Sequence, residues 1–298
     1  MMNSDRRRLG ALTVLSFAQL VVLLDGTIVS IALPQTQEQL GMTEYQRQWV
    51  VTAYTLSFGA LLLLGGRVAD YWGRKRAFIT GMLVFAASSA FGGFAVDPNQ
   101  LIAARALQGA SAALLAPAAL ALVSSIFPKG QDRIRAFAIF GAVGGMGFAV
   151  GLIAGGVLTQ IGSWRWCLFV NVPLAGSIGG VAAYVLHENR SDGDHHYDLP
   201  GALTATVGLG FIVYALTRIE DEGPSKVVAG LLTAGFMFLV VFLCIQRTSK
   251  RPLLPLRLIT DRIRCTALSI QALTGCVTIG TMLYVTLYLQ TVTGLSPL

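Results

Sequence analysis

Charged side chains are scarce in this sequence. They make up 12% of its 298 residues, against roughly a quarter in an ordinary soluble domain. Hydrophobic residues make up 54%, and the mean hydropathy is +0.65. A soluble fold of this size cannot bury so much apolar surface. The shortage of charge therefore excludes a soluble globular protein and makes a lipid bilayer the expected surroundings of the chain.

Motifs for redox chemistry, metal binding and nucleotide hydrolysis are also missing. The cysteines have no CxxC spacing and lie inside or at the edges of apolar stretches, which indicates small apolar side chains rather than disulfides or metal ligands. They are Cys167, Cys244, Cys265 and Cys276. No phosphate-binding P-loop lies between the apolar stretches, so ATP-driven transport by this chain is not expected. We expect no enzymatic activity, no catalytic residue and no cofactor.

The sequence has instead a series of apolar stretches long enough to cross a membrane, which takes about 20 residues of helix. Nine such stretches are separated by charged or Pro/Gly-containing breaks: 9–33, 49–69, 77–96, 101–127, 136–161, 166–187, 199–217, 227–245 and 265–290. The first follows Arg6, Arg7 and Arg8 as in a signal peptide, but it is too long and lacks an A-x-A cleavage site. The sequence predicts an all-α, polytopic transmembrane helical bundle of about nine spans.

Lysines and arginines are unevenly distributed among the breaks, and cytoplasmic segments normally carry their excess. With the N-terminus inside, sixteen fall on inner segments: Arg6, Arg7, Arg8, Arg74, Lys75, Arg76, Lys129, Arg133, Arg135, Arg190, Arg247, Lys250, Arg251, Arg257, Arg262 and Arg264. Four fall on outer segments: Arg47, Arg165, Arg218 and Lys226. This distribution predicts a cytoplasmic N-terminus, and it accounts for the net charge of +7 without a nucleic-acid partner.

The break between the second and third stretches carries a motif. It reads Gly66-Arg67-Val68-Ala69-Asp70-Tyr71-Trp72-Gly73-Arg74-Lys75-Arg76. This segment resembles the G-x-L-A-D-R-x-G-R-[KR]-[KR] signature of the major facilitator superfamily, with Tyr71 where arginine is common. The short link needs Gly73, because a tight turn between two helices favours a residue without a Cβ atom.

The resemblance implies that this segment is a gating loop, which in the family lies against a helix of the second bundle. Its residues would be Gly66, Asp70, Gly73, Arg74, Lys75 and Arg76. We expect Asp70, at a helix end, to pair with Arg74 or with Arg133 and Arg135 of the next inner segment.

Two ionisable residues lie deep inside the apolar stretches. Asp25 precedes Pro34, at the expected outer end of the first span, by nine residues, which is about 13 Å at 1.5 Å per residue. Arg105 enters its own span from the same face. A charge inside the membrane normally has a partner, so we expect Asp25 and Arg105 to meet in the outer half. Gln108, one turn from Arg105, is expected to bind substrate or to orient Asp25.

Two interpretations of the Asp25–Arg105 pair remain open. It can be a structural ion pair that only fixes helix packing. Alternatively, Asp25 couples transport to protons by alternating between ionised and protonated forms, while Arg105 tunes its proton affinity. Two resemblances favour coupling: residues 23–34 are similar to the L-D-x-T-[IV]-V-[NS]-[IV]-A-L-P motif of fourteen-span drug:proton antiporters, and residues 101–113 are similar to the l-x-x-x-R-x-x-q-G-x-g-a-A motif of proton-coupled members.

The fifth stretch is rich in regularly spaced glycines. Residues 147–156 resemble the g-x-x-x-G-P-x-x-G-G motif of drug exporters, with Leu152 in place of the proline. Glycines spaced by four share one helix face and allow another helix to approach closely. We assign a helix-packing role to Gly147, Gly151, Gly155 and Gly156. Packing alone and an antiporter-specific role both remain open for this motif.

Residues 164–173 resemble the W-R-W-x-F-x-[IV]-N-[VIL]-P segment of the same exporters, with Leu168 at the usual first phenylalanine. The resemblance assigns Asn171 to the substrate cavity.

Together these motifs resemble those of the EmrB/QacA-type fourteen-span drug:proton antiporters, multidrug efflux transporters of the bacterial cytoplasmic membrane. The resemblance implies a six-helix transport bundle over residues 1–187, and a cytoplasmic linker with a two-helix insert over 188–246. It places the start of a C-terminal bundle, the ninth helix, at 247–298. We expect the rest of that bundle to be absent, so that the chain is truncated, with substrate binding between bundles at mid-membrane.

The implied function is proton-coupled efflux of a small amphipathic drug or antibiotic, with protons and the lipid bilayer as the other partners. The alternatives are export of an endogenous metabolite, a non-transporting remnant, and a half-transporter that needs a complementary C-terminal half. Residues 192–198 offer histidine and carboxylate side chains. We interpret them as a solvated linker rather than a metal site, because a metal site needs a closed ligand set of fixed geometry.

The charge distribution makes a testable prediction about topology. A reporter fused after Arg76 should report the cytoplasm, and one fused after Asn99 should report the outer side, because the inner segments hold most of the cations. Alkaline phosphatase and a cytoplasm-active fluorescent protein at both sites measure this. The opposite pattern at both sites would overturn the assignment of the first three spans.

Overall fold

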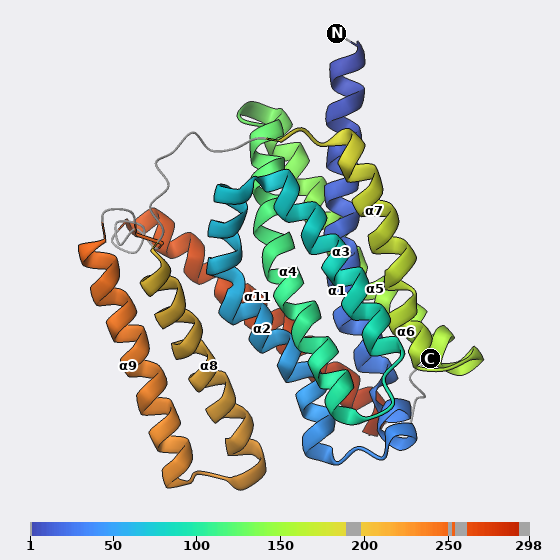
Figure 1. Ribbon diagram of the computed structural model, residues 1–298, viewed down its shortest axis with the longest axis vertical. Helices are drawn as coiled ribbons and strands as arrows, with labels where there is room; N and C mark the ends of the chain where they lie inside the picture. The colour runs from blue at the N-terminus through green and yellow to red at the C-terminus, as the bar shows by residue number, and fades with distance from the viewer. Residues whose placement is uncertain (1, 189–197, 250–251, 254–260, 292–298) are drawn as a thin grey trace.

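The computed structural model describes residues 2–188, 198–249, 252–253 and 261–291. Within these ranges the regular structure is entirely helical (Figure 1). The helices are α1 (Met2–Leu40), α2 (Glu44–Trp72), α3 (Arg74–Gly93), α4 (Pro98–Ile126), α5 (Gly130–Ile161), α6 (Arg165–Phe169), α7 (Asn171–Val185), α8 (Leu199–Glu222), α9 (Lys226–Thr248) and α11 (Arg262–Thr291). The prediction of an all-α fold is confirmed.

In the described part of the chain, eight helical segments are long and apolar enough to cross a membrane, with α6 and α7 together forming one of them. The first eight predicted spans fall on these segments. The ninth, 265–290, lies within α11, which is not among the eight, so its passage through the membrane stays a prediction.

Helix α1 is longer than the first predicted span. It continues through Pro34 to Leu40, although a proline removes one backbone hydrogen bond of the helix. Tertiary contacts hold the extra turns: Gln35 Nε2 donates to the carbonyl of Thr159 at 3.4 Å, and Trp164 Nε1 donates to Gln39 Oε1 at 3.0 Å. The helix therefore continues beyond the predicted end of the first span at residue 33, because proline is tolerated where neighbouring helices support the chain beyond it.

The bundle is built from pairs of neighbouring helices. Helix α1 packs on α5, α2 on α4, and α3 on both α4 and α7. Helices α8 and α9 form a hairpin that lies beside α2 (Figure 1). Thr206 Oγ1 on α8 donates to the carbonyl of Ala60 on α2 at 2.6 Å, and Gln246 Nε2 on α9 donates to Asp198 Oδ2, just before α8, at 2.6 Å. The division of the chain near residues 187 and 246 stays a prediction.

Glycines on α5 allow its backbone to approach α1 closely. A Cβ atom at Gly147 would lie 2.6 Å from the carbonyl oxygen of Leu20, and one at Gly155 would lie 3.2 Å from that of Ile28. Gly151, between them, also faces α1, and Gly156 is buried. Helix α5 runs unbroken through Leu152, where the resembling motif has proline.

The tightest contact joins α4 to α2. A Cβ atom at Gly109 would overlap the carbonyl oxygen of Tyr54, and one at Gly65 would overlap that of Ala113. Because these obstacles are backbone atoms, a rotamer change cannot relieve them. The distance between α2 and α4 therefore depends on both glycines.

Substitution of Gly109 by alanine should lower stability. The methyl group would push α4 away from Tyr54, and such overpacking costs about 1–3 kcal/mol. The matched control is Gly59→Ala on α2, where the space around the new Cβ is open and alanine improves helix propensity by about 0.5–1 kcal/mol. Thermal unfolding in detergent should show a lower midpoint for Gly109→Ala only; equal midpoints would contradict the close contact.

Candidate functional site

A buried carboxylate is held by three side chains inside the helix bundle. Asp25 on α1 is fully buried. Its Oδ2 accepts a hydrogen bond from Arg105 Nη1 at 2.5 Å. Its Oδ1 accepts from Gln108 Nε2 at 3.0 Å and from Asn171 Nδ2 at 2.6 Å. Helices α1, α4 and α7 thus meet at one carboxylate.

The Arg105 guanidinium has further partners on α2. Its Nε donates to the carbonyl of Val50 at 3.3 Å, and its carbon centre lies 4.3 Å from the centre of the Tyr54 ring. Its Nη1 also donates to Gln108 Oε1 at 2.9 Å. The aromatic face adds a cation–π attraction. The guanidinium of Arg105 is therefore held by several groups in addition to Asp25. The residue is 1% exposed.

The two amide side chains extend the network and leave one acceptor open. Gln108 Nε2 also donates to Ser89 Oγ on α3 at 2.7 Å. Asn171 Oδ1 is buried and has no hydrogen-bond partner among the described residues. A buried acceptor without a donor costs about 1–3 kcal/mol. Asn171 therefore offers a place for a donor from a ligand or a water molecule.

This arrangement balances one negative and one positive charge away from solvent, which is the condition under which buried charges are tolerated. If Asp25 takes up a proton, its carboxyl becomes neutral and can itself donate a hydrogen bond. Arg105 would then keep its contacts with Val50, Tyr54 and Gln108.

The structure brings together all four residues that the sequence placed in the proton and substrate sites: Asp25, Arg105, Gln108 and Asn171. Three partners were missed by sequence reasoning, namely Val50, Tyr54 and Ser89. The sequence offered one signal for Ser89, because it is a polar residue inside an apolar stretch. Val50 contributes only its backbone carbonyl, which no sequence pattern marks.

The segment predicted as a gating loop is helical except at Gly73: Gly66 and Asp70 lie in α2, and Arg74, Lys75 and Arg76 lie in the first turn of α3. Gly73 has a φ of +111°, a value that side chains disfavour, so the glycine is needed there. Asp70 Oδ1 accepts from Arg74 Nε at 3.1 Å and from Arg74 Nη2 at 2.9 Å. Of the partners expected for Asp70, the structure shows Arg74. A Cβ atom at Gly66, one turn before Asp70, would lie 3.5 Å from Pro117 Cβ on α4.

Glu188, just beyond α7, was not singled out from the sequence, yet it binds the same loop. Its carboxylate accepts from the backbone N–H groups of Lys75 and Arg76 at 3.3 Å each, and it lies 3.7 Å from Arg76 Nε. The first N–H groups of a helix lack partners within the helix, and they favour a negative charge. Glu188 therefore stabilises the start of α3, while Lys75 Nζ donates to the carbonyl of Ala183 at 2.7 Å.

The segment weighed as a metal site, residues 192–198, lies outside the described residues except for Asp198. Asp198 accepts from the N–H of Gly201 at 3.0 Å and from Gln246. Among the described residues, no group of three histidine, cysteine or carboxylate side chains could hold a metal ion.

The chain belongs to the Major Facilitator Superfamily, whose sequence profile matches residues 15–298. It is a multi-pass protein of the bacterial cell membrane, related to transporters and not to enzymes. These findings confirm the predicted superfamily, membrane location and non-enzymatic class.

Two relatives have informative names. The chain is 47% identical over 294 residues to the puromycin resistance protein pur8 of Streptomyces alboniger, covering 98% of this chain and 58% of pur8. It is 41% identical over 252 residues to the cephamycin export protein CmcT of Amycolatopsis lactamdurans, covering 83% of this chain and 52% of CmcT. The chain thus spans just over half the length of these relatives.

A solved structure shows the same fold. The crystal structure of the peptide transporter POT in complex with sulfate matches 80% of this chain and 52% of that chain, with a TM-score of 0.58 and 17% identity. At this identity the similarity establishes the helical arrangement alone.

The buried network makes a prediction about stability. Arg105→Met should cost about 3–5 kcal/mol, because it leaves the Asp25 carboxylate buried without its cation. The double variant Asp25→Asn/Arg105→Met should recover part of this loss, since it removes both charges. An exposed arginine provides the control, Arg133→Met, with an expected change within about 0.5 kcal/mol. Unfolding in detergent measures these variants and Asp25→Asn alone, and a strictly additive cycle would mean that the two charges are uncoupled.

Proposed function

We propose that this protein exports drugs or antibiotics across the cytoplasmic membrane in exchange for protons, as a fourteen-span antiporter of the superfamily. The observation that carries the proposal is the Asp25 carboxylate, buried within the helix bundle and bound to Arg105, Gln108 and Asn171. Ionisable groups inside membrane spans are costly, and in transporters they serve as proton relays. The names of the relatives pur8 and CmcT support an antibiotic as the substrate.

In this proposal the proton and the substrate compete for one polar cluster. When Asp25 is ionised, Arg105 and the two amides all direct donors at it. A substrate with a hydrogen-bond donor or a positive charge can bind at the open Oδ1 atom of Asn171, next to the ionised Asp25 carboxylate. Protonation of Asp25 removes the negative charge that attracts such a substrate, so uptake of the proton favours release of the substrate. Each change of protonation state thus alters the affinity of the cavity for substrate, which is the requirement for coupled exchange.

The domain organisation predicted from the sequence fits this proposal. The bundle of residues 1–187 would form one wall of the cavity, the helices of 188–246 would be the insert, and residues 247–298 would begin the second bundle, on the same chain or with a complementary half. The gating loop with Asp70 and Arg74 would close the cytoplasmic side by contact with that second bundle. A cluster of this kind also suits export of an endogenous metabolite. The class of compound that is transported therefore distinguishes drug export from metabolite export.

Replacement of the proposed proton carrier should uncouple transport. In everted membrane vesicles that contain the product of the complete reading frame, Asp25→Asn should reduce drug uptake driven by an imposed pH gradient to background. Asparagine keeps the shape of the side chain but cannot release a proton. Substrate counterflow without a gradient should continue, because that exchange needs no proton movement.

The matched control is Asp97→Asn on the same protein. Asp97 caps α4, its Oδ1 accepting from the N–H of Gln100 at 3.0 Å, and asparagine is an equally good cap. This variant should keep gradient-driven uptake. Uphill transport by Asp25→Asn at the wild-type rate would assign proton coupling to another residue and would refute this proposal.

A further inference from the structure

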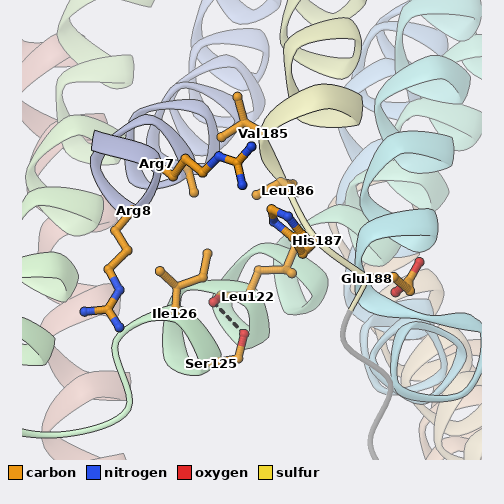
Figure 2. A pocket seen from close by; sticks show the side chains of 10 residues that line it. Arg7, Arg8, Leu122, Ser125, Ile126, Val185, Leu186, His187 and Glu188 are labelled. Carbon is orange, nitrogen blue, oxygen red and sulfur yellow. Dashed lines mark hydrogen bonds between the residues drawn. The ribbon is translucent and has the colours of Figure 1, made fainter. Parts of the chain in front are cut away.

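A separate cavity of about 230 Å³ lies at the end of the bundle where α1, α4 and α7 meet (Figure 2). It is lined by Arg7, Arg8, Ala11, Leu122, Ser125, Ile126, Val185, Leu186, His187 and Glu188. Because Glu188 binds the N–H groups that follow Gly73, the cavity lies at the same end of the bundle as the basic loop of residues 74–76. The distribution of basic residues predicts that this end faces the cytoplasm.

Two neighbouring arginines give the cavity its positive charge. Arg7 and Arg8 extend from the first turns of α1 along its rim, and Arg7 lies toward Leu186 and His187 (Figure 2). Neither arginine has an ion-pair or hydrogen-bond partner among the side chains that the structure describes. Guanidinium groups bind phosphate oxygens through paired N–H donors. The two arginines therefore present unused donors suited to a phosphate.

The one acidic side chain of the lining does not neutralise this charge. Glu188 points away from the arginines (Figure 2), and its two oxygens accept from the backbone N–H groups of Lys75 and Arg76. Ser125 donates to the carbonyl of Leu122 within α4 at 2.9 Å, which leaves the hydroxyl oxygen able to accept. The imidazole of His187 adds an N–H that can donate to an anion.

The rest of the lining is apolar. Ala11, Leu122 and Leu186 are buried and form the part of the cavity nearest the bundle core, while Ile126 and Val185 are only partly buried. A cavity with cationic groups at the rim and apolar side chains inside suits an amphiphile better than a free ion. Basic pockets between transmembrane helices on the cytoplasmic side can bind anionic lipid headgroups.

We propose that this cavity binds the negatively charged headgroup of a phospholipid from the inner leaflet. Arg7 and Arg8 hold the phosphate, His187 donates to it, and the glycerol end of the acyl chains lies against the side chains of α4 and α7. The bound lipid joins the cytoplasmic ends of α1, α4 and α7. This site lies at the inner surface, is separate from the Asp25 cluster and does not depend on what the protein transports.

Lipid titration of the purified full-length protein, followed by native mass spectrometry, tests the site. The probes are phosphatidylglycerol, zwitterionic phosphatidylcholine and inorganic phosphate. The wild type should bind one phosphatidylglycerol more tightly than phosphatidylcholine. Arg7→Gln/Arg8→Gln should weaken that binding roughly 25-fold, because each basic residue near an anionic lipid contributes about a factor of five. The control Arg262→Gln/Arg264→Gln removes the same charge from α11 and should leave the affinity unchanged.

A second variant keeps every charge and fills the space. Ser125→Phe should block the cavity and weaken phosphatidylglycerol binding while Arg7 and Arg8 remain, so a changed topology of the arginine variant cannot account for both results. Equal affinity of wild type and Arg7→Gln/Arg8→Gln for phosphatidylglycerol would overturn the proposal. Equal affinity for the two lipids would also overturn it, and displacement of the lipid by millimolar inorganic phosphate would identify a free-anion site instead.

Discussion

The compensation of one buried negative charge is the constraint on which the rest of this bundle depends. Without water in the hydrocarbon region, the Asp25 carboxylate needs protein donors, and an isolated ion there would cost far more than any single packing contact provides. The donors come from two other helices, and Ser89 and Tyr54 join them from two more. Side chains from five helices therefore meet in the network around Asp25.

Small residues make these hydrogen-bond distances attainable. Gly109 lies one position beyond Gln108 and lets α4 touch the backbone of α2 at Tyr54, whose ring lies against Arg105. Gly147 and Gly151 bring α5 against the turns of α1 next to Asp25. Without a hydrophobic force between helices in lipid, such close backbone contacts and interhelical hydrogen bonds supply the packing energy. The polar site therefore depends on the close helix packing that these glycines allow.

Helix α7 connects this site to the end of the bundle where α2 meets α3. It begins at Asn171, which binds Asp25, and ends shortly before Glu188, which binds the loop between α2 and α3. Its 15 residues span roughly 22 Å at 1.5 Å per residue. One helix thus joins the residue that binds the carboxylate to the residue that binds the start of α3.

The sequence by itself determined the class of fold, the first eight spans and the pairing of Asp25 with Arg105, because hydropathy is a local property and an ion in an apolar stretch needs an opposite charge. The motif around Asp70 identified the superfamily for the same local reason. Only the tertiary structure decided which way each helix is rotated, and hence that Asn171, Ser89 and Tyr54 face the pair. It also decided that α1 continues past Pro34 and that Glu188 reaches the start of α3. These features depend on contacts between residues more than a hundred positions apart in several cases, and such contacts are set by helix packing, which no local pattern records.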